Sequence, residues 1–418
     1  MHTYPETAWT EFQTTWYIYQ QLMTLPFKLR LGKEILNEAF VLNRDEEEVK
    51  SSTKRALNNG VPKEFIHILD EFTGVMATFE THKSGPTFVL RFDIDALPIQ
   101  ETEDAQHLPN LLGFRSRHDN CMHACGHDIH MACLLGTAKI LKRLEDRFYG
   151  SVKLFFQPAE ETVGGAARMI EDGCMKDPDT GAVIAFHVAP YLPAGAIEFC
   201  RGKMNAATCD IQMEVEGVSC HGAHPEGGID AILAGAQIVT ALQSIISRNL
   251  SPTDPGIITI GQFNGGTKEN IVAGDVKMSG TLRALDPDTM DTLKNRVRTV
   301  AEGICQAYGA KLHMTLSDGY PALINSTEIC DDLSAIGTEL FGRDKIYFME
   351  EPSLGADDFS FFSRMCDGLY FNVGTDSGKE AYIQKIHSEY FNPDETSMKN
   401  AMLMEVLGVL HLLEKEKK

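Results

Sequence analysis

Residues 86–94 read PTFVLRFDI, and this run decides the class of fold that the sequence encodes. An apolar stretch that ends at an aspartate predicts a buried strand. A helix-like stretch follows at 127–148, and further apolar runs occur at 151–159, SVKLFFQPA, and at 182–190, AVIAFHVAP. Strands that alternate with helices predict an α/β layered domain with a mainly parallel sheet, whose functional groups gather at the carboxyl ends of the strands.

A different pattern occupies residues 205–318. Strand-like and helix-like stretches follow one another there at 206–217, 230–248, 256–266, 274–285, 286–309 and 310–320. This β-α-β-β-α-β order is ferredoxin-like. The α/β pattern resumes afterwards and ends in a helix from about residue 397. We therefore predict a two-domain α/β protein, with residues 1–204 and 319–418 forming the larger domain and 205–318 forming an inserted one.

The ends of the larger domain show weaker patterns. Residues 5–23 have apolar positions at helical spacing, which predicts a helix near the N-terminus. Residues 34–70 are rich in charge and predict an inserted, mostly helical excursion.

Composition excludes several classes of protein. The 418 residues carry a net charge of −21, which repels phosphate backbones and anionic membrane surfaces, so neither nucleic acid nor membrane is an expected partner. Ten cysteines are spread through this long chain rather than crowded as in a disulfide scaffold. With no run of 18 apolar residues and no signal-peptide pattern, we expect a cytoplasmic protein.

Residues 122–130, MHACGHDIH, concentrate metal-capable side chains at the start of a predicted helix. A thiolate at Cys125 and an imidazole at His127 suit zinc, and also manganese, cobalt or nickel. The alternative is a buried cysteine beside a histidine that only caps the helix. We expect His123 and His130 to pack near the site rather than to bind a metal.

Glu160 and Glu161 follow the second predicted strand in FQPAEE. Adjacent carboxylates repel each other unless a cation lies nearby. Their side chains diverge, so one can bind a metal while the other faces a reacting water as general base. The alternative is a solvated loop.

Four further residues have only weak local support. His187 ends an apolar strand, where a core histidine is the usual interpretation, and His387 lies in a polar loop typical of the surface. His221, in the inserted domain, could donate a hydrogen bond to an oxyanion, and Arg283 could bind a carboxylate with two parallel hydrogen bonds. A loop histidine without a role and a solvated arginine are the alternatives.

Taken together, the motifs resemble a known family. In order along the chain they are RFDIDALPIQE, MHACGHDIHMA, FQPAEE, HVAP, NIVAGDVKMSGTLR, GADDFSFF and IHSEYF. The set resembles the metal-dependent amidohydrolase branch of the aminoacylase/carboxypeptidase clan, which includes hippurate hydrolase and indole-acetyl-amino-acid hydrolases. Within that branch, the segment up to about residue 70 and the Pro225-Glu226 pair look closest to the aminobenzoyl-glutamate hydrolase A-subunit group.

The resemblance implies a role for each matching residue. The implied ligands of two divalent metal ions, zinc or manganese with cobalt or nickel also open, are Cys125, His127, Glu161, His187 and His387. Cys125 is a candidate bridge between the ions. The resemblance also implies that Glu160 is the general base and that Asp95, with Asp93 beside it, orients a metal ligand.

The resemblance further implies that the inserted domain is a lid that carries a dimer interface. His221 and Asn270 match residues that reach the neighbouring subunit's site, and Arg283 matches a position that holds the substrate carboxylate. Glu226 replaces a histidine of most relatives, which changes the charge near the lid.

We therefore expect hydrolysis of the amide bond in N-acyl- or N-aroyl-amino acids, aminobenzoyl-glutamate among them, by metal-bound hydroxide with Glu160 as general base. The expected assembly is a homodimer formed through the inserted domain, and a heterologous second subunit is left open. One alternative is a dipeptidase or carboxypeptidase of the same clan. Another, from a different class, is a dimeric metal-binding protein without catalysis.

Overall fold

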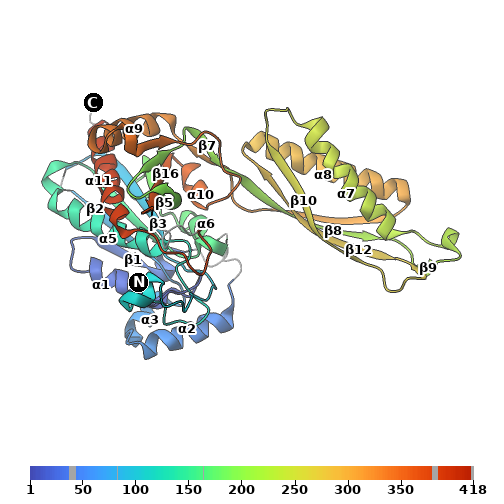
Figure 1. Cartoon of the computed structure of the whole chain (residues 1–418), viewed down its shortest axis with the longest axis horizontal. Helices are drawn as coiled ribbons and strands as arrows, with labels where there is room; N and C mark the ends of the chain where they lie inside the picture. Colours follow the sequence, from blue (N-terminus) through green and yellow to red (C-terminus); the bar gives the residue numbers. More distant parts are fainter. Residues whose placement is uncertain (37–43, 82, 163, 379–384, 416–418) are drawn as a thin grey trace. The chain divides into compact units, whose positions relative to one another are not determined.

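The computed structural model describes residues 1–36, 44–81, 83–162, 164–378 and 385–415. The chain forms two compact units (Figure 1). The first comprises residues 1–202, 324–350 and 361–418, and the second comprises residues 203–323 and 351–360.

The first unit is built on an eight-stranded sheet with the order β1-β2-β4-β3-β5-β16-β6-β15. Its central strands β4, β3, β5 and β16 run parallel, whereas β1–β2, β2–β4 and β16–β6 are antiparallel pairs. The predicted parallel sheet is thus its centre, and the whole sheet is mixed. In chain order the strands are β1 Lys28–Leu31, β2 Val75–Glu80, β3 Thr87–Asp93, β4 Ser151–Gln157, β5 Ala182–Pro193, β6 Ile197–Phe199, β15 Ile346–Phe348 and β16 Asp367–Asp376.

Helices α5 and α11 pack against each other and against this sheet (Figure 1). Phe88, Leu90 and Phe92 of β3 alternate into the core shared with these helices, while Arg91 and Asp93 point to the opposite face and are also buried. The helices of the first unit are α1 Phe12–Leu22, α2 Glu46–Asn58, α3 Lys63–Leu69, α4 Leu108–Leu112, α5 His127–Arg143, α6 Gly165–Glu171, α9 Thr327–Phe341 and α11 Met398–Lys415. Helix α10, Phe359–Ser363, begins in the second unit and ends in the first.

The N-terminal predictions can be compared with these helices. The helix predicted over 5–23 is shorter, because residues before Phe12 form turns instead. The predicted excursion over 34–70 is largely helical where it is described, and its part at 37–43 lies outside the described residues.

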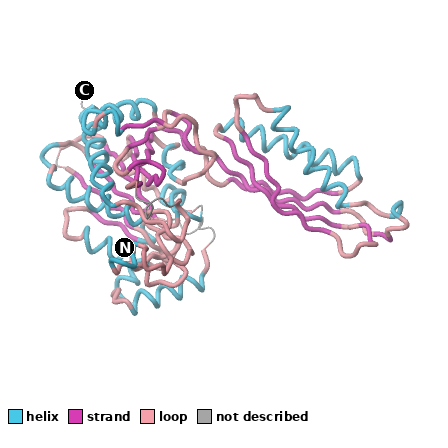
Figure 2. The backbone as a smooth tube through the Cα atoms, in the orientation of Figure 1, coloured by secondary structure: helices cyan, strands magenta, loops and turns pink. Residues whose placement is uncertain are grey.

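The second unit has the ferredoxin-like topology that its pattern predicts. Its four-stranded antiparallel sheet has the order β10-β12-β8-β13, and α7 and α8 cover one face (Figures 1 and 2). Two short strands, β9 and β11, pair at one end. The elements are β8 Ala207–Glu216, β9 Cys220–His221, α7 Ala231–Asn249, β10 Gly256–Gly265, β11 Ile271–Val272, β12 Asp275–Ala284, α8 Pro287–Tyr308 and β13 Lys311–Asp318.

The borders of the second unit differ from those predicted at 205 and 318. Residues 351–360, which the sequence pattern assigned to the larger domain, pack with the second unit. Backbone hydrogen bonds explain this, because the Ser353 N–H donates to the Met204 carbonyl and the Ala206 N–H donates to the Gly355 carbonyl. The short strands β7 Gly202–Asn205 and β14 Leu323–Asn325 lie where the chain passes between the units.

Helix α7 is the one helix of the described residues long and apolar enough to cross a membrane by length and composition. It is amphipathic, and Ile238, Leu242 and Ile245 are buried in the core of the second unit. Such a helix fits the packed face of a two-layer domain.

Candidate metal centre

The sheet of the first unit brings the predicted site residues to one edge. Asp93 ends β3, and Glu160 and Glu161 form the first turn after β4. His187 lies in β5, and Cys125 and His127 stand at the N-terminal end of α5. Because β4, β3 and β5 are parallel neighbours, their carboxyl-terminal halves meet at the same edge of the sheet.

Cys125, His127 and His187 form a first group whose ligand atoms all lie within 4.8 Å of one another. The Cys125 Sγ is 3.3 Å from the His187 Nε2. The His127 Nδ1 is 2.8 Å from the Asp95 carbonyl oxygen, and the His187 Nδ1 is 2.8 Å from the Val188 carbonyl oxygen. Since a carbonyl only accepts, each Nδ1 carries a proton, which leaves each Nε2 as the atom that a metal ion would bind.

Cys125, Glu161 and His387 form a second group of the same kind. The His387 Nε2 is 3.4 Å from the Glu161 Oε1. His387 has a left-handed backbone, with φ of 62°, and its N–H donates to the Ala124 carbonyl, which fixes the loop beside the helix start. Cys125 belongs to both groups, as a ligand that bridges two ions would.

Two buried atoms of these groups lack a hydrogen-bond partner among the described residues. They are the His127 Nε2 and the Glu161 Oε1. Buried polar atoms are normally hydrogen-bonded, so leaving the His127 nitrogen and the Glu161 oxygen without a partner is costly in free energy. A cation bound between them would satisfy both, so the donor set fits a metal.

The charges around the two groups also favour a bound cation. Burial would lower the pKa of His127, but Asp93, Asp95 and Glu161 outweigh it and raise that pKa to about 10. Burial raises the pKa of the Cys125 thiol well above its usual range, and the nearby carboxylates add to this. A divalent cation would compensate the same negative charge and favour the thiolate, as metal sites do.

Glu160 and Asp95 lie beside the two groups. The Glu160 side chain is 7% exposed, and its carboxylate lies within 4.8 Å of ligand atoms of His127 and Glu161. The Asp95 Oδ1 is 3.3 Å from the His127 Nδ1, while its Oδ2 accepts the Glu161 N–H at 3.0 Å. Asp95 therefore contacts two of the segments that carry predicted ligands.

His130 packs beside the two groups and uses both ring nitrogens in hydrogen bonds. Its Nε2 accepts the Val188 N–H at 3.2 Å, so its Nδ1 carries the proton and donates to the Asp93 Oδ1 at 2.6 Å. With both nitrogens engaged, His130 is a packing partner of the site, although it lies within ligand distance of Asp93 and His127. His123 is also buried, and neither of its nitrogens has a partner among the described residues.

Arg91 is a site residue that the sequence motifs did not reveal. Its NH1 donates to the Asp93 Oδ2 at 3.0 Å, and its Nε donates to the Gln157 Oε1 at 2.7 Å. Burial alone would raise the pKa of Asp93, but His127, His130 and Arg91 together hold it well below its usual range. The sequence did contain one signal for this pair. The arginine stands two positions before an aspartate on a buried strand, so both side chains point to the same face.

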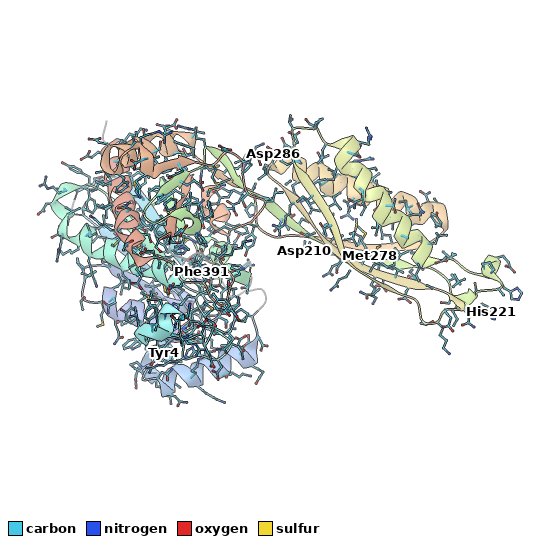
Figure 3. All side chains as sticks on the ribbon, in the orientation of Figure 1. Tyr4, Asp210, His221, Met278, Asp286 and Phe391 are labelled. Carbon is cyan, nitrogen blue, oxygen red and sulfur yellow. The ribbon has the colours of Figure 1, made fainter. Side chains whose placement is uncertain are left out.

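The remaining predicted residues lie in the second unit. His221 and Asn270 are exposed neighbours at the β9–β11 end, where the Ala223 N–H donates to the His221 Nδ1 at 3.0 Å. Arg283 stands near the last residue of β12 and donates to the Leu354 carbonyl at 2.9 Å. Figure 3 shows His221 and Asp286, three residues beyond Arg283, at opposite ends of this unit. The unit therefore brings His221 and Asn270 together and keeps Arg283 apart from them.

Two ligand groups that share a thiol, with a carboxylate beside them, define a metal-dependent hydrolase as the class of protein. The family model described as peptidase family M20/M25/M40 matches residues 89–407, and the chain belongs to this family.

Its relatives include both peptidases and deacylases. The chain is 34% identical over 410 residues to thermostable carboxypeptidase 1 of Saccharolobus solfataricus, covering 97% of this chain and 92% of the relative. It is 35% identical over 327 residues to N-acetyl-L-cysteine deacetylase of Bacillus subtilis, covering 78% and 74%. A crystal structure of the Bacillus subtilis YXEP protein, described as a dinuclear metal binding peptidase from the M20 family, has a TM-score of 0.75 and 26% identity over 99% of this chain and 95% of that one.

These relationships bear out the family resemblance of the motifs. The chain is a metallo-amidohydrolase of this family, with ligand groups for two divalent ions. Neither the relatives nor the ligands distinguish zinc from manganese, and none of these three relatives is named for aminobenzoyl-glutamate.

Proposed function

We propose that this protein hydrolyses the amide bond that joins an acyl or aroyl group to an amino acid, with aminobenzoyl-glutamate-like compounds among its substrates. One observation carries the proposal. Cys125 belongs to two ligand groups at once, and the buried carboxylate of Glu160, which is not needed to complete either, lies beside them. A protein that only stored metal would not require that carboxylate.

The proposed ligands are Cys125, His127, Glu161, His187 and His387. Divalent ions held there would lower the pKa of a water molecule and polarise the scissile carbonyl. Glu160 accepts a proton from the attacking water and delivers it to the leaving amine. Asp95 orients the His127 ring and fixes the Glu161 backbone, since its carboxylate contacts both.

The second unit supplies the remaining proposed contacts. The Ala223 N–H occupies the His221 Nδ1, so the neutral ring carries its proton on Nε2 and can donate it to the oxyanion. Asn270 stands beside it, and Arg283 binds the substrate carboxylate. Because β12 alone, at about 3.3 Å per residue, separates the two ends by about 30 Å, one copy cannot offer His221 and Arg283 to the same small substrate. We therefore propose a homodimer.

The proposed location is the cytoplasm. All ten cysteines are free, and eight of them are buried. Free thiols persist in a reducing compartment, where disulfides are rare.

Cleavage of a peptide rather than an acyl-amino acid is the second candidate function. It is favoured by the carboxypeptidase among the relatives, which aligns over nearly the whole chain. The two candidates differ in the acyl group on the carbonyl side of the scissile bond, so substrates whose acyl group has or lacks a free α-amino group separate them.

The test is amine release from hippurate, N-acetyl-amino acids, p-aminobenzoyl-glutamate and free dipeptides, by chelated protein restored separately with Zn²⁺ or Mn²⁺. We expect cleavage of acyl-amino acids only with metal restored. Glu160→Gln should fold and bind metal but lose at least about 100-fold in kcat. Glu64→Gln, at an exposed glutamate of α3, is the matched control and should match the wild type. Turnover of E160Q at the wild-type rate would refute the role of Glu160, and cleavage of dipeptides alone would favour the second candidate.

A further inference from the structure

The turn that carries Glu160 has an unusual backbone. Ala159, the residue before it, has φ of 57°, a left-handed conformation that residues with a side chain rarely adopt. The Ala159 carbonyl accepts the N–H groups of Gly164 and Gly165, each at 3.2 Å. Such a conformation persists only where its surroundings hold it, so the contacts of the Ala159 N–H matter for the direction of the next side chain.

The Ala159 N–H is hydrogen-bonded to a residue near the N-terminus of the chain. Glu11, next to the first residue of α1 and 0% exposed, accepts the Ala159 N–H on its Oε1 at 2.9 Å. Its Oε2 accepts the Thr73 hydroxyl at 2.5 Å. Trp9, two residues earlier, lies against Gly164, where an added Cβ would come within 2.5 Å of its ring. The segment before α1 thus packs on the whole turn.

Two buried carboxylates therefore hold the turn on either side of Glu160. Glu11 accepts the N–H of the residue before it, and Asp95 accepts the N–H of Glu161, the residue after it, at 3.0 Å. Because the peptide groups on both sides are fixed, the Glu160 carboxylate can move only by a change of its own side-chain rotamer. Asp95 was expected to orient the site from the family resemblance, whereas nothing assigned a role to Glu11.

We propose that Glu11 is a positioning residue for the general base: it holds the Ala159 backbone in its left-handed conformation and so aims the Glu160 carboxylate. This inference rests on the proposed function, because it assumes that Glu160 moves the proton. Glu11 touches neither the ligand groups nor the substrate, so its loss should reduce the rate without releasing metal.

The chain provides a matched control in Glu6. This glutamate is also fully buried, and its carboxylate accepts the Gln13 N–H, the Thr14 N–H and the Thr14 hydroxyl at 3.2, 2.8 and 3.0 Å. It bonds to the first turn of α1, the helix that Glu11 precedes, but makes no bond to the turn at 158–161. A substitution there removes a comparable buried carboxylate while leaving the Ala159 N–H paired.

The experiment compares Glu11→Leu, Glu11→Gln and Glu6→Leu in full-length protein loaded with Zn²⁺ or Mn²⁺. Burial and the nearby Asp95 charge raise the pKa of Glu11 to about 8, so the neutral glutamine is a close substitute that can still accept the Ala159 N–H. We expect E11L to lose about 100-fold in kcat, because displacing a reacting group by about 1 Å can lower the rate by that factor. KM and metal content should stay unchanged. E11Q should stay within about tenfold of the wild type, and E6L should lose thermal stability but keep its kcat.

Amide hydrogen exchange of the peptide that contains Ala159 supplies a readout independent of turnover. The proposal requires faster exchange there in E11L than in E6L. It is overturned if the two variants have equal kcat or equal exchange, or if E11L loses metal. If E11L does not fold, the pair Glu11→Asp and Glu6→Asp replaces it, because the shorter side chain withdraws the carboxylate from Ala159. If the wild type cleaves nothing, the proposed function fails, and the exchange data alone decide whether Glu11 holds the turn.

Discussion

Glu405 predicts a pH dependence of stability that can be measured on its own. It lies on α11 with a fully buried side chain, in the core between the sheet and α5. Its Oε2 contacts the Thr137 hydroxyl, and its Oε1 has no partner among the described residues. Burial therefore raises the pKa of this carboxyl from 4.5 to about 8, against the smaller effect of Thr137.

The sign follows from proton linkage. A carboxyl whose pKa is raised on folding stabilises the protein below its unfolded pKa, and that stability is lost as the pH rises toward the folded pKa. At about 1.4 kcal/mol per pH unit, the loss between pH 5 and pH 8 is about 3 to 4 kcal/mol. Glu405→Gln cannot ionise, so its advantage over the wild type should grow by that amount across the interval.

Tryptophan fluorescence during denaturant unfolding reports on the right unit, because Trp9 and Trp16 are the only tryptophans and both lie in the first unit. Unfolding free energies of wild type and E405Q should be measured on chelated protein from pH 5 to 8.5. Taking the difference cancels every other titrating group, and chelation removes the pH dependence of metal binding. A difference that stays flat with pH would refute the reasoning and mean that Glu405 is ionised in the folded protein.

Further predictions concern the site, the core and the substrate. Cys125→Ser removes the ligand shared by both groups, so elemental analysis should find less metal on the folded protein, and Co²⁺-loaded protein should lose its thiolate absorption band. Lys153→Met should lower the unfolding free energy by about 3 kcal/mol, because the buried ammonium donates to three carbonyls within residues 174–178 that would lose their partner. Arg283→Lys should raise KM about tenfold for substrates with a free α-carboxylate and leave KM for the corresponding amides unchanged.

The fold was predictable where the chain has long, regular patterns. In β8, Ala207, Cys209 and Ile211 alternate with more exposed residues, and a period of two in apolar residues is sufficient to predict a strand. Strand β6 was not predicted, because its three residues are too few to show a period. The segment 351–360 was misplaced because hydrogen bonds of its own backbone attach it to the second unit, and such bonds leave no pattern in its side chains.

In the site, too, residues within local sequence motifs were predictable, and residues that act through contacts with distant segments were not. The five ligands were predicted because their motifs resemble a family, and the structure brings these residues into two overlapping groups. Asp95 was predicted from the same resemblance, whereas Glu11 and Arg91 were not. Glu11 precedes a helix, where an acidic residue usually faces water and stabilises the helix start, so nothing local indicates that it is buried against a turn 148 residues away. Arg91 stands two residues before its partner Asp93, but its second partner, Gln157, is a neighbour across the sheet that no local pattern indicates.

The separation within the second unit leads to one more prediction, about assembly. If His221 and Arg283 both contact one substrate, they must come from two copies, since within a copy they lie at opposite ends of the second unit, separated by the length of β12, about 30 Å. A His221→Ala chain then has an intact metal centre but cannot complete its partner's site, and an E160Q chain has the opposite defect. Each is inactive alone, yet a mixed dimer contains one site with no defect.

Mixing the two variants under conditions that exchange subunits therefore tests the arrangement. Random pairing of equal amounts makes half of the dimers mixed, each with one intact site of two, so activity should return to about a quarter of the wild-type value. A double variant that carries both substitutions in one chain, mixed with itself, is the control and should stay inactive. If the mixture stays inactive although native mass spectrometry detects mixed dimers, His221 serves the site of its own chain, and Arg283 cannot then hold the carboxylate of the same substrate from that chain.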